Sequence, residues 1–346
     1  MKRYKHLYEE IISIENIKLA LIRASKNKRH RKSVKRILAN PELFVNKIHE
    51  MLKTESYVPS KYTQMIINED IKPRKISKLP FYPDRIIQHA ILNILGPIFK
   101  ESLCLCVCAS VPCRGISLAH KLSKKYASKY QYCLKLDISK YYESIDQNLL
   151  KKKLQRKFLD TKLIALLFRI INSYEDSPGR GIPIGSYLSQ FFANFFLNDF
   201  DRFLKETLKL KSIVRYMDDV CIYENSKNLL QKQLYKIKNF LQSENLKIKH
   251  NYQIFCIAKR GVDFVGYRFF DKFIILRKRI HLRYLKLCAK IKQQKKAFLK
   301  DIQVLFSYFG RFFAFNSFWY KRTNFYPLEE FVILSHPKYL WAFAPK

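Results

Sequence analysis

The chain has 346 residues, and its 66 lysines and arginines outweigh its 28 aspartates and glutamates to give a net charge of +38. A charge excess of this size opposes compaction unless a polyanion neutralises it, so we predict a nucleic-acid partner. With 48% hydrophobic residues the chain can bury a large core over two or three subdomains. The opening residues MKRYKHLYEE hold no apolar signal core and no apolar run approaches about 18 residues, which argues against secretion and membrane insertion and predicts a cytoplasmic protein.

The first 56 residues carry apolar side chains at helical spacing on both sides of a basic stretch. The two series are Leu7, Ile11, Ile14, Ile17 and Leu21, then Val34, Ile37, Leu38, Leu43, Ile48 and Leu52. This periodicity predicts a helical N-terminal extension over residues 1–56.

Residues 57–81 are strand-like and basic, and a helix is predicted to begin near Asp84, as its cap, and to run to Phe99. Beyond residue 132 the sequence alternates between strands and helices. Helices are predicted over 148–171, 186–210 and 227–243, with strands ending at Asp137, around Tyr216, through Phe255 and over 262–269. This order predicts an α+β fold in which an antiparallel sheet is backed by helices.

Four of the eight cysteines lie close together in the sequence: Cys104, Cys106, Cys108 and Cys113. The C-x-C-x-C spacing would place three thiols on one face of a strand, but it lacks the paired C-x₂-C knuckles of structural zinc sites. We therefore expect reduced thiols, several of which fill strand positions as small hydrophobes, and not a zinc centre.

The candidate active site is formed by three acids at strand ends. In the segment SIVRYMDDVCI, Asp218 and Asp219 stand between two apolar arms that predict a β-hairpin whose turn presents both carboxylates to one side. Asp137 ends an upstream alternating strand and can face the hairpin tip from a neighbouring strand. Carboxylates from separate strands can bridge a pair of Mg²⁺ ions about 3.5–4 Å apart, as phosphoryl transfer requires. An Asp-Asp pair at a turn also has a structural interpretation, because Asx side chains cap turns.

The YMDD string, together with Asp137 in a D-x-x-x-x-Tyr pattern, resembles the palm of reverse transcriptases, and the resemblance runs from about Tyr57 to about Gly266. It implies an RNA-directed DNA polymerase with a right-hand fold. Fingers are expected over residues 57–132, a palm interleaved with fingers elements over 133–269, and a short basic helical thumb over 270–346.

The resemblance implies a role for each acid. Asp137 and Asp218 match the metal-binding acids and Asp219 matches the third, supporting acid of a two-Mg²⁺ site, in which Mn²⁺ can substitute. Tyr142 matches the aromatic gate that excludes a 2′ hydroxyl and so selects deoxynucleotides. Its alternative interpretation is a core aromatic residue.

Further matches concern the substrates. Lys72, Arg74 and Lys75 match the basic fingers segment that grips the incoming triphosphate, although such residues are also typical of a solvated edge strand. Ile184, Gly185 and Gln190 lie in the I-G-x-x-x-S-Q segment, which resembles reverse transcriptases of diversity-generating retroelements and differs from the retroviral and group II intron pattern. Gly185 would let the backbone approach the template or nucleotide.

Ile184 offers apolar contact where relatives have a hydrogen-bonding Gln, which predicts error-prone synthesis. The tracts 110–119 and 305–326 also resemble segments of the diversity-generating group. One departure is Tyr252, which occupies the position of a Lys that protonates the leaving pyrophosphate in many relatives; Lys247 or Lys249 can substitute.

We therefore expect a bacterial or phage-encoded enzyme that copies an RNA template from a DNA or RNA primer with deoxynucleoside triphosphates, in a diversity-generating retroelement with a structured noncoding RNA and a small accessory protein. One alternative is a defence-associated bacterial reverse transcriptase that acts with a noncoding RNA against phage. A second is an RNA-binding maturase or scaffold that does not polymerise.

Overall fold

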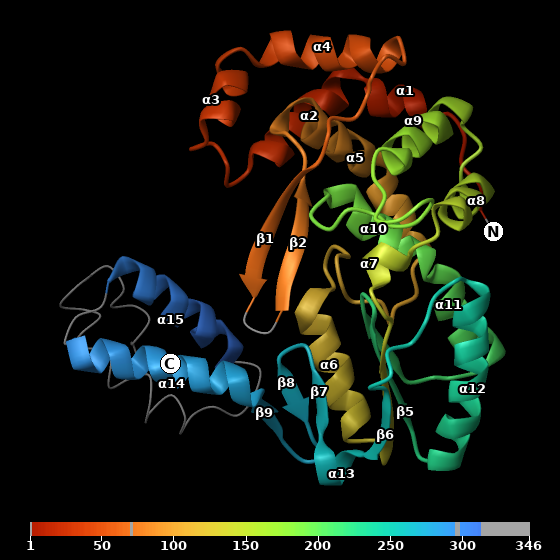
Figure 1. Ribbon diagram of the computed structural model, residues 1–346, viewed down its shortest axis with the longest axis vertical. Coiled ribbons are helices and arrows are strands. Elements are labelled where there is room, and N and C mark those ends of the chain that lie inside the picture. Colours follow the sequence, from red (N-terminus) through yellow and green to blue (C-terminus); the bar gives the residue numbers. More distant parts are fainter. Residues whose placement is uncertain (1, 70–71, 295–297, 313–346) are drawn as a thin grey trace. The chain divides into compact units, whose positions relative to one another are not determined.

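The computed structural model describes residues 2–69, 72–294 and 298–312 (Figure 1). The chain divides into two compact units. Unit 1 comprises Met1–Gly115, Leu136–Val220 and Gln231–Tyr252, and unit 2 comprises Ile116–Lys135, Cys221–Leu230 and the residues from Gln253 onward. Within the described ranges, no helix is both long enough and apolar enough to cross a membrane.

The N-terminal part of unit 1 is helical, as its apolar periodicity predicts. Its elements are α1 (Tyr8–Ile12), α2 (Ile14–Ser25), α3 (Lys32–Ala39), α4 (Pro41–Lys53) and α5 (Ile86–Ser102). Ile17 of α2 and Ile91 of α5 are fully buried, and the buried Asn16 side chain donates to the Ala90 carbonyl 3.0 Å away. Apolar packing and this buried hydrogen bond join α2 to α5.

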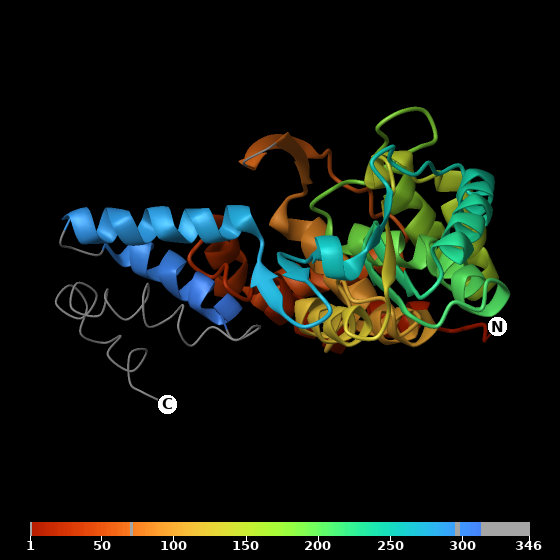
Figure 2. The same cartoon turned by 90° about the horizontal axis from the view of Figure 1, so that it is seen from below.

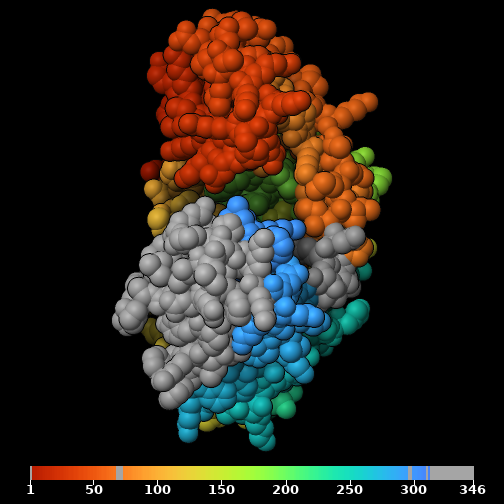
Figure 3. Space-filling model, turned by 90° about the vertical axis from the view of Figure 1, so that its left-hand side faces the viewer, coloured from red at the N-terminus to blue at the C-terminus, as the bar shows by residue number. Residues whose placement is uncertain are grey.

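A two-stranded antiparallel hairpin lies between α4 and α5. It consists of β1 (Thr63–Glu69) and β2 (Lys72–Lys78), with Ile67 opposite Arg74. The hairpin lies at the surface of unit 1 (orange in Figure 3), and Ile66 on β1 is 69% exposed. Both strands fall within the segment that the sequence predicts to be extended.

The prediction that Asp84 caps the helix is wrong. Asp84 is fully buried and accepts hydrogen bonds from the Tyr57 hydroxyl and the Ser60 amide, at 2.8 and 2.9 Å. It lies in a π-helical turn, Phe81–Arg85, and the residue that precedes α5 is Arg85, which makes no side-chain cap. The carboxylate fixes the segment before β1, a tertiary role that local spacing does not reveal.

The middle of unit 1 contains shorter helices than the sequence predicts. They are α7 (Tyr141–Ser144), α8 (Gln147–Lys157), α9 (Thr161–Asn172), α10 (Tyr187–Phe196) and α11 (Asn198–Arg202). The predicted helix over 148–171 is interrupted because Phe158 is extended and the Asp160 side chain caps α9 by accepting from the Leu163 amide. The predicted helix over 186–210 likewise divides into α10, α11 and a π-helical turn, Phe203–Thr207.

A four-stranded sheet carries the predicted acids. Its strands β3 (Tyr132–Asp137), β4 (Ile213–Tyr216), β5 (Asp219–Glu224) and β6 (Gln253–Cys256) have the spatial order β4-β5-β3-β6. Strand β6 runs antiparallel to β3, with Tyr132 opposite Cys256. The helix α12 (Lys227–Ser243) has the bounds that the sequence predicts.

Unit 2 also contains a small antiparallel sheet and two long basic helices. The elements are α6 (Gly115–Ala127), α13 (Ile257–Arg260), β7 (Val262–Phe264), β8 (Tyr267–Phe269), β9 (Ile274–Leu276), α14 (Lys278–Gln294) and α15 (Leu299–Phe312). His120 of α6 packs edge-on against Tyr267 and Phe269 of β8, with ring centroids about 5 Å apart. Figure 2 shows α14 beside α15, where Tyr284 contacts Tyr308. Of the predicted helical segment 270–346, α14 and α15 are helical but begin only after the strand β9, and residues 313–346 lie outside the described part.

Candidate active site

The turn between β4 and β5 consists of Met217 and Asp218. Its flanking strands are buried, with Val214, Val220 and Ile222 fully inaccessible to solvent, as the apolar arms predict. Asp218 lies in the turn itself, whereas Asp219 is the first residue of β5. The predicted hairpin is therefore present, but its turn holds one of the two adjacent acids and the second begins the strand.

Asp137, at the end of β3, lies beside this turn. The amide of Ile138 donates to the Asp218 carbonyl at 3.3 Å, which joins the end of β3 to the turn. The two carboxyl groups also interact directly. Burial, the negative charge of Asp137 and a hydrogen bond to Asp137 together raise the pKa of Asp218 to about 7. Asp218 thus keeps its proton up to near neutral pH, and its carboxyl group forms an acid pair with that of Asp137.

Lys249 supplies a positive charge to this pair. Its ammonium lies 2.6 Å from Oδ2 of Asp137, and its backbone amide donates to the Asp137 carbonyl at 2.8 Å. The exposed Lys247 contributes its carbonyl to the Ser139 amide. Of the two lysines that the sequence offers in place of Tyr252, Lys249 is the one whose ammonium binds a predicted catalytic acid. Tyr252 instead accepts a hydrogen bond from Lys238, at 2.9 Å.

The acid pair has the chemistry of a divalent-cation site. With both groups ionised, Oδ1 of Asp137 is buried and has no hydrogen-bond partner. Burial and the neighbouring charge of Asp137 both disfavour ionised Asp218, and an oxygen-loving cation such as Mg²⁺ would offset both effects. Within residues 2–69, 72–294 and 298–312, no group of three or more His, Cys, Asp or Glu side chains is arranged to hold a metal. The pair is therefore the part of the predicted three-acid site that the structure assembles, and the role of Asp219 stays a prediction.

Tyr142 lies next to the turn. Its hydroxyl is 3.9 Å from the Met217 sulfur, and its pKa is raised first by burial and then by the negative charge of Asp218. The neighbouring Tyr141 is the residue that fills the core, since it is 3% exposed and donates to the Ala193 carbonyl. Tyr142 itself is half-buried. Tyr142 is thus the more accessible of the two tyrosines, and its role as the gate stays a prediction.

The predicted substrate loop packs against β2. The Ser77 amide donates to the Ile184 carbonyl at 2.7 Å. Gly185 has a φ of +110°, and a Cβ atom there would lie 2.7 Å from Cγ2 of Ile76 and 2.8 Å from the Ser77 carbonyl. The close approach that Gly185 permits in this structure is thus to the backbone of β2, whereas the sequence suggested an approach to the template or nucleotide. The Gln190 amide oxygen accepts from the Ser110 hydroxyl at 3.2 Å.

The predicted triphosphate-binding residues lie on β2. In the antiparallel register, Lys72, Arg74 and Lys75 stand opposite Glu69, Ile67 and Ile66 respectively. The side chains of Arg74 and Lys75 are exposed, while the side chain of Lys72 lies outside the described part. The hydrogen bond between Ser77 and Ile184 therefore joins the strand that carries these cations to the predicted substrate loop.

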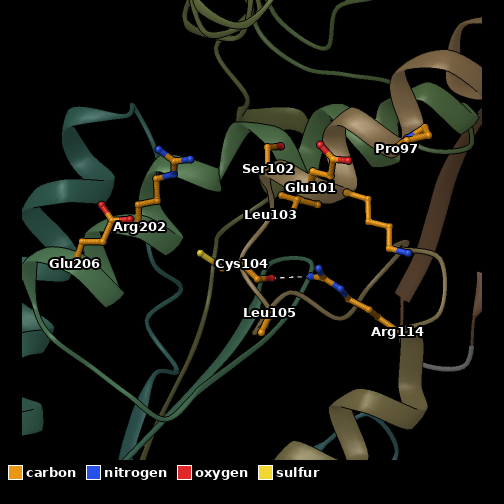
Figure 4. A pocket seen from close by; sticks show the side chains of 10 residues that line it. Pro97, Glu101, Ser102, Leu103, Cys104, Leu105, Arg114, Arg202 and Glu206 are labelled. Atoms are coloured by element: carbon orange, nitrogen blue, oxygen red, sulfur yellow. Dashed lines mark hydrogen bonds between the residues drawn. The ribbon is translucent and has the colours of Figure 1, made fainter. Parts of the chain in front are cut away.

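The cysteine segment is a turn and not the predicted strand. The Val107 amide donates to the Cys104 carbonyl at 3.1 Å, and Leu105 at the turn is 73% exposed. The turn adjoins a cavity of about 620 Å³, and Figure 4 shows the side chains that line it, among them Cys104 and Arg114. Arg114 donates to the Cys104 carbonyl at 2.7 Å and so stabilises the turn. Because the chain turns here, the C-x-C-x-C spacing does not align three thiols on one strand face.

Sequence reasoning missed the buried residues behind the turn. Arg215 of β4 and Asp201 of α11 are both fully buried, and Nη2 of Arg215 lies 2.6 Å from Oδ2 of Asp201. The sequence did hold one signal, the single charged residue Arg215 in the otherwise apolar string IVRY. A charged side chain in a strand that is buried on both faces requires an oppositely charged or hydrogen-bonding partner.

Comparison with known proteins identifies the family. The reverse transcriptase (RNA-dependent DNA polymerase) family matches residues 66–269, which is more than half of the chain. The chain belongs to the reverse transcriptase family. The match covers the second half of β1, all of β2, the acid pair, Lys249 and the strands β7 and β8. Family membership and the mixture of helices with antiparallel sheets confirm the predicted α+β polymerase class.

Several relatives share parts of this sequence. The group II intron-encoded protein LtrA of Lactococcus lactis subsp. cremoris is 24% identical over 273 residues, which cover 74% of this chain and 45% of LtrA. Protein YkfC of Escherichia coli K12 is 26% identical over 139 residues, covering 37% of this chain and 36% of YkfC. The chain thus spans less than half the length of these relatives. Among solved structures, apo telomerase from Candida tropicalis, truncated from its C-terminal domain, has a TM-score of 0.48 at 16% identity and covers 66% of this chain and 58% of its own.

Proposed function

We propose that this protein is an RNA-directed DNA polymerase that extends a DNA or RNA primer on an RNA template. The observation that carries the proposal is the acid pair Asp137 and Asp218, which the hydrogen bond from the Ile138 amide to the Asp218 carbonyl brings together within the family's matched region. In such a site Asp137 and Asp218 would hold two Mg²⁺ ions, or Mn²⁺ in their place. When bound, these ions favour ionisation of the primer 3′ hydroxyl and stabilise the charge of the leaving pyrophosphate.

The chain's own residues then have separate tasks. Lys249 pairs with Asp137 in this structure and would be the cation that approaches a leaving pyrophosphate. Tyr142, whose hydroxyl lies 3.9 Å from the Met217 sulfur, would select the sugar of an incoming deoxynucleoside triphosphate. Arg74 and Lys75 on β2 would bind its phosphates, with Lys72 as a third cation, and Asp219 would support the acid pair. Fingers over 57–132, a palm over 133–269 and a thumb over 270–346 are the corresponding division of the chain.

Primer extension tests this proposal. Asp137→Ala and Asp218→Ala should each abolish Mg²⁺-dependent incorporation on an RNA template, because either change removes half of the acid pair. A matched control is Asp146→Asn, since Asp146 caps α8 by accepting from the Leu149 amide and Asn is an equally good capping residue. Incorporation that persists in both alanine variants would contradict the proposed role of the acid pair. No incorporation by the folded wild-type protein would contradict the polymerase proposal and favour a non-polymerising maturase or scaffold.

For the biological role, we propose error-prone synthesis in a diversity-generating retroelement, with a structured noncoding RNA and a small accessory protein as partners. The contact between Ser110 and Gln190 supports this role, because it joins two of the segments that resemble that group. Ile184 supports it as well, since its half-buried apolar side chain offers no directional hydrogen bond to a base. The alternative is a defence-associated reverse transcriptase that acts with a noncoding RNA against phage.

Sequencing of complementary DNA made on one RNA template separates these roles. Ile184→Gln should lower misincorporation about tenfold if it restores about 1.4 kcal/mol of discrimination. Leu188→Met, a volume-conserving change in the buried face of α10, is the control for packing effects. High fidelity of the unmodified protein, or an unchanged error spectrum in Ile184→Gln, would contradict the mutagenic role and favour the defence role.

A further inference from the structure

Arg215 is the largest fully buried side chain in the described part of the chain, and it binds three different segments of unit 1. Its Nε and Nη2 atoms donate to the two carboxylate oxygens of Asp201, at 2.7 and 2.6 Å. Its Nη1 donates to the Asn194 side-chain oxygen at 3.1 Å and to the Met217 carbonyl at 3.0 Å. One guanidinium therefore connects α10, α11 and the turn that carries Asp218.

The cost of burying this ion pair indicates that it has a role other than stability. Desolvating two charges offsets most of their attraction, and apolar side chains of similar volume often stabilise a core equally well. A methionine at position 215 could fill the same space, but it could not donate to the Met217 carbonyl. The feature that requires an arginine is thus the bidentate fork combined with a further donor aimed at the turn.

The Met217 backbone has a conformation that needs such support. Its φ is +58°, in the left-handed region that favours glycine, and the Cβ atom of methionine makes this conformation unfavourable. The hydrogen bond from Arg215 to the Met217 carbonyl opposes relaxation of the turn. Asp218 is the next residue, so a change in the backbone dihedral angles of Met217 moves the carboxyl group of Asp218 relative to Asp137.

The backbone of Arg215 is held from the opposite side. Its amide donates to the Cys106 carbonyl and its carbonyl accepts from the Cys108 amide, both at 2.9 Å. Arg114, which donates to the Cys104 carbonyl beside the cavity of Figure 4, stabilises the same segment. Both the main chain and the side chain of Arg215 are therefore fixed before any substrate binds, as a residue that orients another group must be.

We infer that Arg215, with Asp201 and Asn194 as its anchors, is a positioning residue that holds the Met217 turn so that Asp218 is presented to the metal ions beside Asp137. This inference rests on the proposed function, because it concerns the metal-binding geometry of the same acid pair. Partners that orient a metal ligand typically contribute about 10- to 100-fold to metal affinity. We expect a loss of that size when the arginine is replaced.

Four variants separate positioning from stability. Arg215→Met removes the donor, Arg215→Lys keeps a charge but not the fork, and Arg215→Met with Asp201→Leu replaces the whole pair by apolar groups. The matched control is Lys153→Met, because Lys153 is also buried and its ammonium binds Asp199, Glu244 and the Phe196 carbonyl, none of which belongs to the turn. For each variant, Mn²⁺ binding is measured from the spectroscopic signal of free Mn²⁺, and thermal unfolding and primer extension are measured alongside.

The inference predicts that Arg215→Met and the double variant weaken Mn²⁺ binding about 10- to 100-fold, with Arg215→Lys intermediate. The double variant should recover thermal stability without recovering Mn²⁺ affinity, and Lys153→Met should lose stability while binding Mn²⁺ normally. Wild-type Mn²⁺ affinity in a folded double variant would overturn the inference and leave Arg215 a structural residue. If the unmodified protein binds Mn²⁺ but extends no primer, the proposed function fails while the positioning role is still decided by the binding data. If the unmodified protein binds no Mn²⁺, both fail.

Discussion

The raised pKa of Asp218 predicts how the stability of the metal-free protein depends on pH. The folded-state pKa is about 7, compared with an ordinary value of 3.8. Between these values the folded protein binds a proton that the unfolded chain releases, so Asp218 contributes stability that is fully present below about pH 4 and is lost as the pH rises toward 7. Asp218→Asn removes this dependence.

The magnitude follows from linkage. Each pH unit in this window changes the free energy of unfolding by about 1.4 kcal/mol, and the whole window by about 4 kcal/mol as an upper limit, because solvent screens a half-buried group. Urea unfolding in the presence of a chelator, at intervals from pH 4 to pH 8, measures the difference between wild type and Asp218→Asn.

The stability of Asp218→Asn relative to wild type should rise across this range in the chelated protein. Added Mg²⁺ should reduce the rise, because a cation bound by the acid pair compensates the charge of ionised Asp218. Asp146→Asn, which changes a carboxylate outside the pair, should show no Mg²⁺-sensitive trend of this kind. If the free energy of unfolding depends on pH in the same way for wild type and Asp218→Asn, the raised pKa of Asp218 is refuted.

Three further predictions concern single side chains. Lys249→Met should raise the pKa of Asp218, since the positive charge of Lys249 lowers that pKa. The same variant should bind Mn²⁺ more tightly above pH 8, because the ammonium that competes for Asp137 is absent. Unchanged Mn²⁺ binding would show that Lys249 does not compete. Tyr142→Val should admit ribonucleotides in single-nucleotide incorporation, whereas Tyr141→Phe should not; equal discrimination in both variants would return Tyr142 to a packing role. The hydrogen bond from Cys106 lowers the pKa of Cys104 to about 7, whereas burial raises the pKa of Cys108. After brief iodoacetamide treatment at pH 7, mass spectrometry should therefore find Cys104 alkylated before Cys108. Alkylation in the reverse order would contradict this.

Elements with strong local signals were predictable from the sequence. The apolar periodicity of residues 227–243 gave α12 with its observed bounds, and the alternation ending at Asp137 gave β3. Periodicity alone did not reveal the break in the predicted helix over 148–171, because the apolar pattern continues across the break. The break depends on the Asp160 side chain, which caps α9 by accepting from the Leu163 amide.

The parts that escaped prediction depend on contacts between residues distant in the sequence. Asp84 has the residue type and position of a helix cap, yet its carboxylate accepts hydrogen bonds from Tyr57 and Ser60 in the segment before β1. The role of Arg215 depends on Asp201 and on the Met217 backbone, and neither can be read from a strand pattern. Sequence patterns thus located the candidate acids, whose role stays a prediction, while the residues that pair with them and support them became visible only in the folded chain.

The central claim is that Asp137 and Asp218 form the metal-dependent centre of a polymerase. The most direct measurement is Mg²⁺-dependent extension of a primer on an RNA template by the wild-type protein, Asp218→Ala and Asp146→Asn, with thermal unfolding of each to confirm folding. The account predicts complementary DNA from wild type and Asp146→Asn, and none from folded Asp218→Ala. Equal synthesis by all three proteins would contradict it.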